Sequence, residues 1–142
     1  MDERKALIKV VGEQNFGDDN DVIELTTIGT LEETEESYIL RYNEELEPQS
    51  APIKTQLSIQ KNRERVELMR SGKHGSLLII ERAKRNLCNY ATEYGDLLMG
   101  IYGRSIEHSV EEKEGRIVFG YDIDINGAIT SQNEVTVTFR LN

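Results

Sequence analysis

The sequence predicts an all-β domain, and three observations lead to this prediction. Apolar and polar residues alternate along most of the chain, short polar segments separate the alternating runs, and no stretch repeats with the 3.6-residue period of a helix. Residues 115–142 are the clearest case, because two alternating runs flank the dipeptide Asn126-Gly127. Asparagine followed by glycine supplies the two positive-φ positions of a tight hairpin turn. The chain is therefore expected to end in a β-hairpin.

Successive side chains of a strand point to opposite faces of a sheet, so each alternating run has one apolar face. In the hairpin these faces comprise Ile117, Phe119, Tyr121, Ile123 and Ile125 on the first run and Val135, Val137, Phe139 and Leu141 on the second. The same pattern predicts earlier strands at residues 3–11, 21–32, 37–44, 54–60, 65–70, 76–81, 86–92 and 97–110. Residues 12–21 are rich in glycine, asparagine and aspartate, and we expect a loop there.

Glycines interrupt two of the predicted strands. Gly29 lies within residues 21–32, whereas Gly100 and Gly103 lie within residues 97–110. An isolated glycine in a strand is typical of a bulge or a bend. We therefore expect a bend or bulge at Gly29 and a bulge near Gly100 and Gly103.

About ten antiparallel strands in 142 residues favour one domain that spans residues 1–142. Exposed sheet edges promote aggregation, and closing the sheet on itself removes them. The sequence therefore predicts a single antiparallel up-and-down β-barrel of about 8–10 strands. A two-sheet sandwich is the alternative.

Composition excludes several classes of protein. Hydrophobic residues make up 37% of the chain and charged residues 30%, and no apolar run reaches the roughly 20 residues that cross a bilayer. The charged N-terminal segment lacks the apolar region of a secretory signal, so a cytoplasmic location is expected. A formal net charge of −9 argues against nucleic acid as a partner, because binding to phosphates requires a basic surface. The single cysteine, Cys88, cannot form an internal disulfide.

Several short motifs, taken in order, resemble those of the YwiB-like family of small bacterial β-barrels. They are Met69-Arg70-Ser71-Gly72, Thr92-Glu93-Tyr94-Gly95, Glu112-Lys113-Glu114-Gly115-Arg116-Ile117 and Tyr121-Asp122. The second motif departs from the family pattern, which has proline where Glu93 stands. The resemblance implies a calycin-like or lipocalin-like barrel and brings no assigned activity with it.

Two acidic segments were considered as metal sites. Residues 122–129 match the first half of an EF-hand calcium loop, but position twelve is Asn133 instead of glutamate, and strands flank the segment where helices are required. The cluster of Asp18, Asp19, Asn20 and Asp21 is more typical of a solvated loop. His74, His108 and Cys88 have no zinc-ligand spacing. No metal and no cofactor are therefore expected.

An enzymatic function has little support in the sequence. Cys88 is a candidate nucleophile with a histidine as its base, but cysteine is also among the residue types most often buried. No serine occurs in a Gly-x-Ser-x-Gly turn, and residues 100–103 do not form a phosphate-binding loop. We expect a protein that is not an enzyme, and an enzyme of unknown reaction ranks third among the hypotheses.

The leading hypothesis is that the barrel mouth binds a small amphipathic ligand. Arginine and tyrosine side chains combine an apolar body with a polar tip, which suits one end of such a ligand. The residues expected around the mouth are Arg70, Tyr90, Tyr94, Arg104 and Tyr121. The alternative is that these side chains cap a barrel filled by its own core, because eight strands enclose little free space.

The second hypothesis is a protein-interaction module that acts through its outer surface as a homodimer. Residues 77–80 and 97–102 are apolar on both faces, so one face of each would remain outside the barrel. Exposed apolar patches commonly mark protein contacts, and a symmetric dimer is the commonest result. The interface residues expected from this pattern are Leu78, Ile80, Leu98 and Tyr102.

Overall fold

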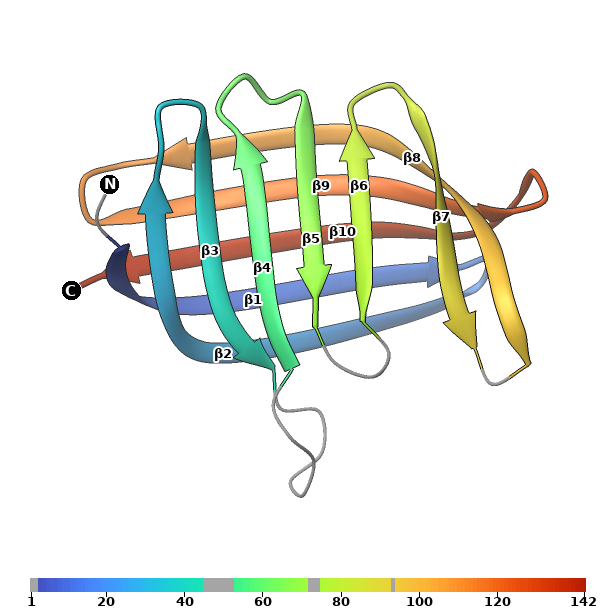
Figure 1. Cartoon of the computed structure of the whole chain (residues 1–142), viewed down its shortest axis with the longest axis horizontal. Coiled ribbons are helices and arrows are strands. Elements are labelled where there is room, and N and C mark those ends of the chain that lie inside the picture. The colour runs from blue at the N-terminus through green and yellow to red at the C-terminus, as the bar shows by residue number, and fades with distance from the viewer. Residues whose placement is uncertain (1–2, 45–52, 72–74, 93) are drawn as a thin grey trace.

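Ten strands form a nearly closed antiparallel barrel in the computed structural model, which describes residues 3–44, 53–71, 75–92 and 94–142 (Figure 1). The strands are β1 Glu3–Phe16, β2 Asp19–Glu33, β3 Ser37–Glu44, β4 Ile53–Gln60, β5 Arg65–Arg70, β6 Ser76–Glu81, β7 Arg85–Thr92, β8 Gly95–Val110, β9 Glu114–Ile125 and β10 Ala128–Leu141. No helix occurs among the described residues, so none is long and apolar enough to span a membrane. The prediction of an all-β barrel is confirmed.

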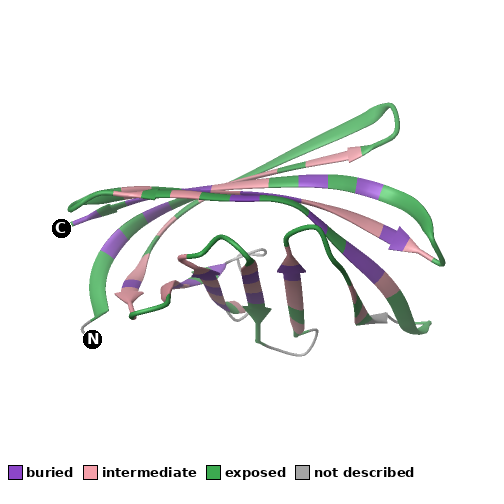
Figure 2. Ribbon diagram, turned by 90° about the horizontal axis from the view of Figure 1, so that it is seen from above, coloured by how far each residue is buried: buried purple, intermediate pink, exposed green. Residues whose placement is uncertain are grey.

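The strands follow the order β6-β5-β4-β3-β2-β1-β10-β9-β8-β7, and every neighbouring pair is antiparallel. Apart from the pair β1 and β10, every hydrogen-bonded pair joins strands that are consecutive in sequence, and β6 and β7 stand at the two ends of the sheet. The long strands β1, β2, β8, β9 and β10 form an arched layer, and the shorter strands β3 to β6 cross beneath it (Figures 1 and 2). The barrel is thus flattened into two layers that share one interior.

A short seam near Gly103 brings the two ends of the sheet together. Arg82, directly after β6, forms a parallel bridge with Gly103 of β8. The amide of Ala83 donates to the Gly103 carbonyl at 2.8 Å, and the amide of Gly103 donates to the Lys84 carbonyl at 3.1 Å. A β-bulge between Gly103 and Ser105 lies at the same place, as the glycines of this strand predict.

Side chains from both layers fill the interior and form one apolar cluster. The largest fully buried members are Phe119, Ile8, Leu31, Leu40, Leu57, Ile59, Ile80, Ile101, Ile106, Ile117, Val66 and Val137. Burial of each such side chain contributes about 2 kcal/mol before the loss of conformational entropy. The centre of the barrel is therefore a packed core.

The C-terminal hairpin has the predicted turn. Asn126 and Gly127 have φ angles of 55° and 85°, and Ile125 pairs with Ala128 across them. The loop predicted at residues 12–21 is wrong, because β1 and β2 continue to a tight turn at Gly17 and Asp18. Polar side chains pair across this extension, where the Asn20 amide donates to Glu13 Oε1 at 2.9 Å.

Gly29 lies where β2 curves away from β3. The β1–β2 register continues through Gly29 without a shift, so no bulge lies there. Figure 1 shows that β2 bends along its length, and its pairing with β3 begins at Thr30, directly after Gly29. A Cβ atom on Gly29 would overlap the Arg41 carbonyl oxygen and approach Ile8 Cδ1. Beyond this point β2 pairs with β3 only from Thr30 to Glu33.

The seam predicts a large effect of Gly103→Ala. The added Cβ would overlap the backbone carbonyl of Glu81, which cannot move without separating β6 from β8. We expect the free energy of unfolding in urea to fall by about 1–3 kcal/mol. Gly12→Ala is the matched control, because a Cβ there meets no atom within 4 Å. Equal stability of the two variants would contradict the role of the seam.

Candidate functional site

A polar row crosses the inner face of β3, β4 and β5 at one end of the barrel. Tyr42 pairs with Thr55, and Thr55 pairs with Arg70. The preceding inward row, Leu40, Leu57 and Leu68, is apolar and buried. Because inward positions recur every second residue, Tyr42 and Thr55 are buried as well, with exposed fractions of 6% and 3%. The interior therefore changes from apolar to polar at this end.

Glu44 and Arg70 form an ion pair beside this row. Arg70 Nε donates to Glu44 Oε2 at 3.1 Å, and Glu44 is buried while the Arg70 side chain is 42% exposed. The ion pair therefore has one partner, Glu44, in the interior and the other, Arg70, partly in solvent. The pKa of Tyr42 is raised to about 12, mainly by burial and also by the charge of Glu44, while the charge of Arg70 opposes the shift.

Tyr121 faces the same space from β9 in the other layer. Its ring stacks on Phe119 with centroids 6.2 Å apart. Burial raises the pKa of Tyr121, and the charge of Arg70 opposes this shift, so Arg70 lies within electrostatic range of the phenol. We define the mouth cluster as Tyr42, Glu44, Thr55, Arg70 and Tyr121.

Two features suit the mouth cluster to a ligand. Among the described residues, the hydroxyl of Thr55 has no hydrogen-bond partner although it is buried. A groove of about 590 Å³ lies where β2 diverges from β3. Most of its lining residues, such as Arg41 and Met69, occupy outward positions, and the inward residues Tyr42, Thr55 and Arg70 border it. Polar groups therefore meet an accessible groove at this end of the barrel.

Apolar residues on the inner face of the long-stranded layer are incompletely covered near β2. Ile23 pairs with Gly12, which pairs with Val135. Ile23 is 65% exposed, while Val10 and Val135 are only partly buried against the core. The inner surface thus offers both apolar and polar contacts.

The opposite end of the barrel is closed by side chains. The ring of His108 packs edge-on against Tyr38 with centroids 5.5 Å apart, and His108 Nε2 lies 2.9 Å from the Lys61 carbonyl oxygen. The Lys61 ammonium sits 4.9 Å from the centroid of the Tyr38 ring and pairs with Glu33. The mouth cluster therefore marks the more open of these two ends.

Arg104 lies outside the barrel, so its predicted place beside Arg70 at the mouth is wrong. It follows the bulge of β8, and its guanidinium lies over Gly120 on the outer face of β9. Arg104 Nε is 2.8 Å from Asp122 Oδ1, an ion pair without hydrogen-bond geometry, and Arg104 Nη2 donates to the Asn133 carbonyl at 2.8 Å. The bulge turns this side chain to the outer face.

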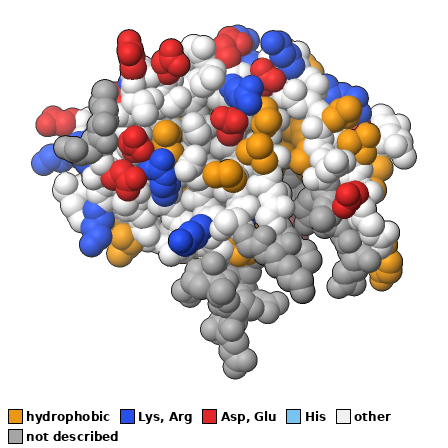
Figure 3. All heavy atoms as spheres, in the orientation of Figure 1, with side chains coloured by type: hydrophobic (Ala, Val, Ile, Leu, Met, Phe, Trp, Pro, Cys, Tyr) orange, Lys and Arg blue, Asp and Glu red, His pale blue; other side chains and the backbone are white. Residues whose placement is uncertain are grey.

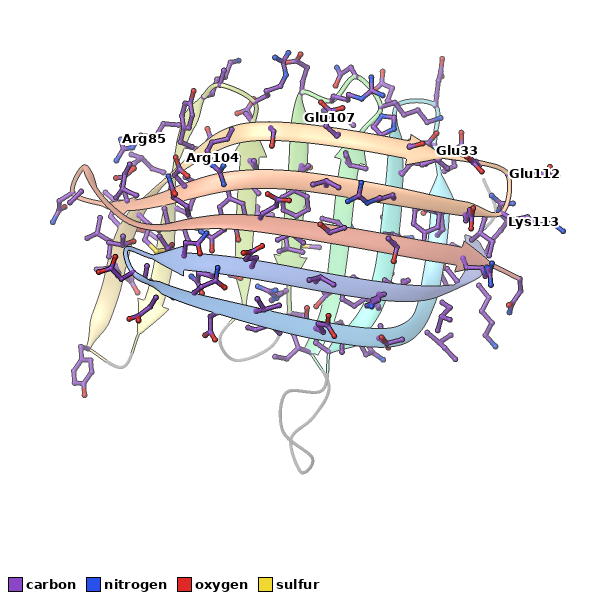
Figure 4. All side chains as sticks on the ribbon, turned by 180° about the vertical axis from the view of Figure 1, so that it is seen from behind. Glu33, Arg85, Arg104, Glu107, Glu112 and Lys113 are labelled. Atoms are coloured by element: carbon purple, nitrogen blue, oxygen red, sulfur yellow. The ribbon has the colours of Figure 1, made fainter. Side chains whose placement is uncertain are left out.

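A second arginine–aspartate pair lies at the same end of the long-stranded layer (Figure 4). Arg85 reaches across Gly100 and donates to both carboxylate oxygens of Asp124, at 2.8 and 2.7 Å. These hydrogen bonds hold the pKa of Asp124 below its usual value, and Asp124 Oδ1 also accepts from the amide of Gly127 at 3.2 Å. The carboxylates of the calcium-loop motif are therefore engaged by arginines and by the hairpin turn.

The remaining predicted mouth residues have different positions. Tyr94 is 97% exposed, beyond the interior. The backbone of Tyr90 belongs to β7, but its side chain lies outside the described residues. Sequence reasoning therefore brought Arg70 and Tyr121 together and missed Tyr42, Glu44 and Thr55. The period-2 pattern of residues 37–44 and 53–60 places these three on the inward side, and that signal could have found them.

Two of the four predicted interface residues face the interior, and the other two are exposed. Ile80 is fully buried in the core, so its predicted place on an interface is wrong, and Leu78 packs partly against the core. Both side chains fill the interior because β6 is an edge strand that the long-stranded layer covers. Leu98 and Tyr102 are 50% and 39% exposed on β8.

Cys88 is poorly placed as a nucleophile. Its thiol lies 3.4 Å from the carbonyl oxygen of Leu77, and burial raises its pKa. A raised pKa lowers the fraction of reactive thiolate at neutral pH. His74 lies outside the described residues, and His108 is engaged at the closed end. Among the described residues, no group of three or more histidine, cysteine, aspartate or glutamate side chains is arranged to hold a metal.

A larger groove, of about 680 Å³, lies on the outer face of β1, β8, β9 and β10. Its lining includes the cations Lys9, Arg116 and Arg140 and the anions Glu111 and Glu114. This mixture of charges favours no single class of ligand. The mouth cluster, where buried polar groups converge, is therefore the better candidate site.

Together these features define a nearly closed β-barrel with an apolar core and one polar mouth. The chain belongs to the family described as a domain of unknown function, DUF1934, whose profile matches residues 8–137. The ywiB protein from Bacillus subtilis has a similar crystal structure, with a TM-score of 0.82 and 22% identity over 99% of this chain and 93% of that chain. The resemblance to the YwiB-like family is confirmed. No curated protein matches the chain significantly.

The buried phenol of Tyr42 predicts a loss of stability in alkali. Unfolded tyrosine releases its proton near pH 10, whereas folded Tyr42 keeps it to about pH 12. The unfolded state therefore binds fewer protons in this interval, and the free energy of unfolding falls as the pH rises. Urea titrations from pH 9 to pH 12 should show this fall reduced by about 1–3 kcal/mol in Tyr42→Phe. Tyr102→Phe, on the outer surface, is the control, and an unchanged slope in Tyr42→Phe would contradict the burial.

Proposed function

We propose that this protein is a non-catalytic, cytoplasmic, calycin-like barrel that binds a small amphipathic ligand at the mouth. The polar end of the ligand accepts hydrogen bonds from Arg70 and the tyrosine hydroxyls of the mouth cluster. Its apolar body lies along the incompletely covered inner face near Ile23 and Val135. One observation carries this proposal: polar side chains replace the apolar core at the mouth, and among the described residues the buried hydroxyl of Thr55 there has no hydrogen-bond partner.

The physical chemistry of the cluster supports an acceptor at the polar end of the ligand. Arg70 carries five N–H donors in a fixed plane, and Glu44 takes the Nε donor. Tyr42 and Tyr121 are protonated at neutral pH, as tyrosine ordinarily is, and burial raises their pKa values further. A protonated phenol can donate a hydrogen bond to a ligand. A packed core beneath the cluster confines the ligand to the mouth.

Three ten-carbon amphiphiles test this function, with decanoate as the anionic probe, decanol as the neutral probe and decylamine as the cationic probe. We expect decanoate to raise the melting temperature most, because a carboxylate accepts hydrogen bonds from Arg70. Arg70→Ala should remove the decanoate shift and weaken binding by about tenfold or more. Arg65→Ala, at the other end of β5, is the matched control and should retain it. Equal shifts in both variants, or none with any probe, would refute the proposal.

A homodimer formed through the outer surface is the second candidate. Leu87, Leu98 and Tyr102 are 61%, 50% and 39% exposed on β7 and β8. Hydrophobic side chains also lie among charged ones on the face presented by β3 to β7 (Figure 3). Exposed apolar side chains of this size favour a protein contact.

Light scattering over a range of protein concentrations tests the dimer. We expect a dimer that Leu98→Lys converts to a monomer, because a lysine would bring a charge into the apolar contact. Ile129→Lys, at a position that is 64% exposed on β10, is the control. A monomer at high concentration would contradict this second candidate and leave ligand binding unaffected.

A further inference from the structure

Part of β2 is an unpaired edge of the sheet. β2 pairs with β1 over residues 19–33, whereas its pairing with β3 is confined to residues 30–33. Among the described residues, no strand pairs with the other side of residues 19–29. In Figure 1 this segment forms the lower border of the long-stranded layer. Its outward backbone amides and carbonyls are therefore available to a further strand.

The segment carries acidic side chains but lacks two other devices that protect an edge. It contains no lysine and no proline, and its register with β1 is continuous, so no bulge twists it away. Val22 and Ile23 point to opposite faces and are 55% and 65% exposed, and Ile28 is 64% exposed. An added strand could cover these β-branched side chains on both faces of the sheet.

The charge of the edge indicates what kind of strand it accepts. Asp18, Asp19, Asp21 and Glu24 lie on or beside it, and residues 17–29 contain no lysine or arginine. None of these four carboxylates forms an ion pair with a described residue. A second copy of the chain would bring the same acidic groups together, and like charges directly opposite one another destabilise paired strands. A basic strand meets no such repulsion.

We propose that residues 19–29 of β2 bind an extended, basic segment of another protein by strand addition. Backbone hydrogen bonds to the open edge hold the segment. Its apolar side chains alternate with lysine or arginine, so that the apolar face covers Val22 and Ile28 while the cations on the other face meet Asp19 and Asp21. This edge does not include Arg70 or the rest of the mouth cluster, although Ile23 and Ile28 also border the space proposed for the ligand. The peptide test and the Arg70→Ala test can therefore fail independently.

Two peptides of about ten residues test the proposal, a length typical of a strand. In the first, lysine alternates with valine or threonine. The second has the same sequence with every second backbone nitrogen methylated, which removes the hydrogen bonds of one edge and leaves the charge unchanged. We expect the first peptide to bind at least about tenfold more tightly than the second in fluorescence anisotropy. Hydrogen exchange should then slow at amides within residues 19–29 and not in β6 or β7.

Charge variants of the whole chain complete the test. Asp21→Lys combined with Glu24→Lys should weaken binding of the lysine peptide by at least about tenfold. Glu107→Lys combined with Glu112→Lys makes the same change in net charge (Figure 4). Neither residue lines the outer groove to which Thr26 of β2 contributes, so this variant should bind nearly as the unmodified chain does. Thermal melting checks that each variant is folded. The proposal would be overturned if neither peptide bound, if both peptides bound equally well, or if both variants lost affinity equally. Slower hydrogen exchange at another sheet edge, or a dimer joined through β2, would also overturn it.

Discussion

The seam between β6 and β8 is the constraint on which the other features depend. A ten-stranded sheet that did not close would leave its apolar inner face in water. Closure at Gly103 requires a residue without a side chain, because the Glu81 carbonyl occupies the space of a Cβ atom. Once the seam forms, β3 to β6 cover the long-stranded layer, and Phe119 and Leu57 enter a common core. The same closure brings Arg70 of β5 within electrostatic range of Tyr121 of β9.

The polar groups at the mouth lower the stability of the folded protein, whereas the apolar core does not. A buried hydroxyl without a partner, such as that of Thr55, destabilises a protein by about 1–3 kcal/mol. An apolar residue of similar size at position 55 would avoid this cost, as Leu57 does two residues later. The phenols of Tyr42 and Tyr121 are protonated donors at neutral pH, and burial extends this state to more alkaline pH. This balance of cost and chemistry supports a binding role for this end of the barrel.

The groove and the open edge have a common structural origin. β2 separates from β3 on the N-terminal side of Thr30, and the adjacent Gly29 has no room for a side chain because the Arg41 carbonyl oxygen lies close to it. The groove lies beside this separation, and the unpaired residues 19–29 extend from it. A single bend thus creates two different surfaces, one suited to a small amphipathic molecule and one suited to a strand.

Period-2 alternation, a local property, determined the strands of this protein. Strands at residues 37–44, 65–70 and 76–81 have the predicted bounds, and Asn126-Gly127 forms the predicted turn. The polar extension of β1 to Phe16 escaped prediction, because cross-strand pairing stabilises it without an apolar face. Alternation also cannot say which face becomes the interior. Only closure of the barrel decided that Ile80 and Thr55 point inward while Arg104 points outward, because the interior is formed by strands distant in sequence.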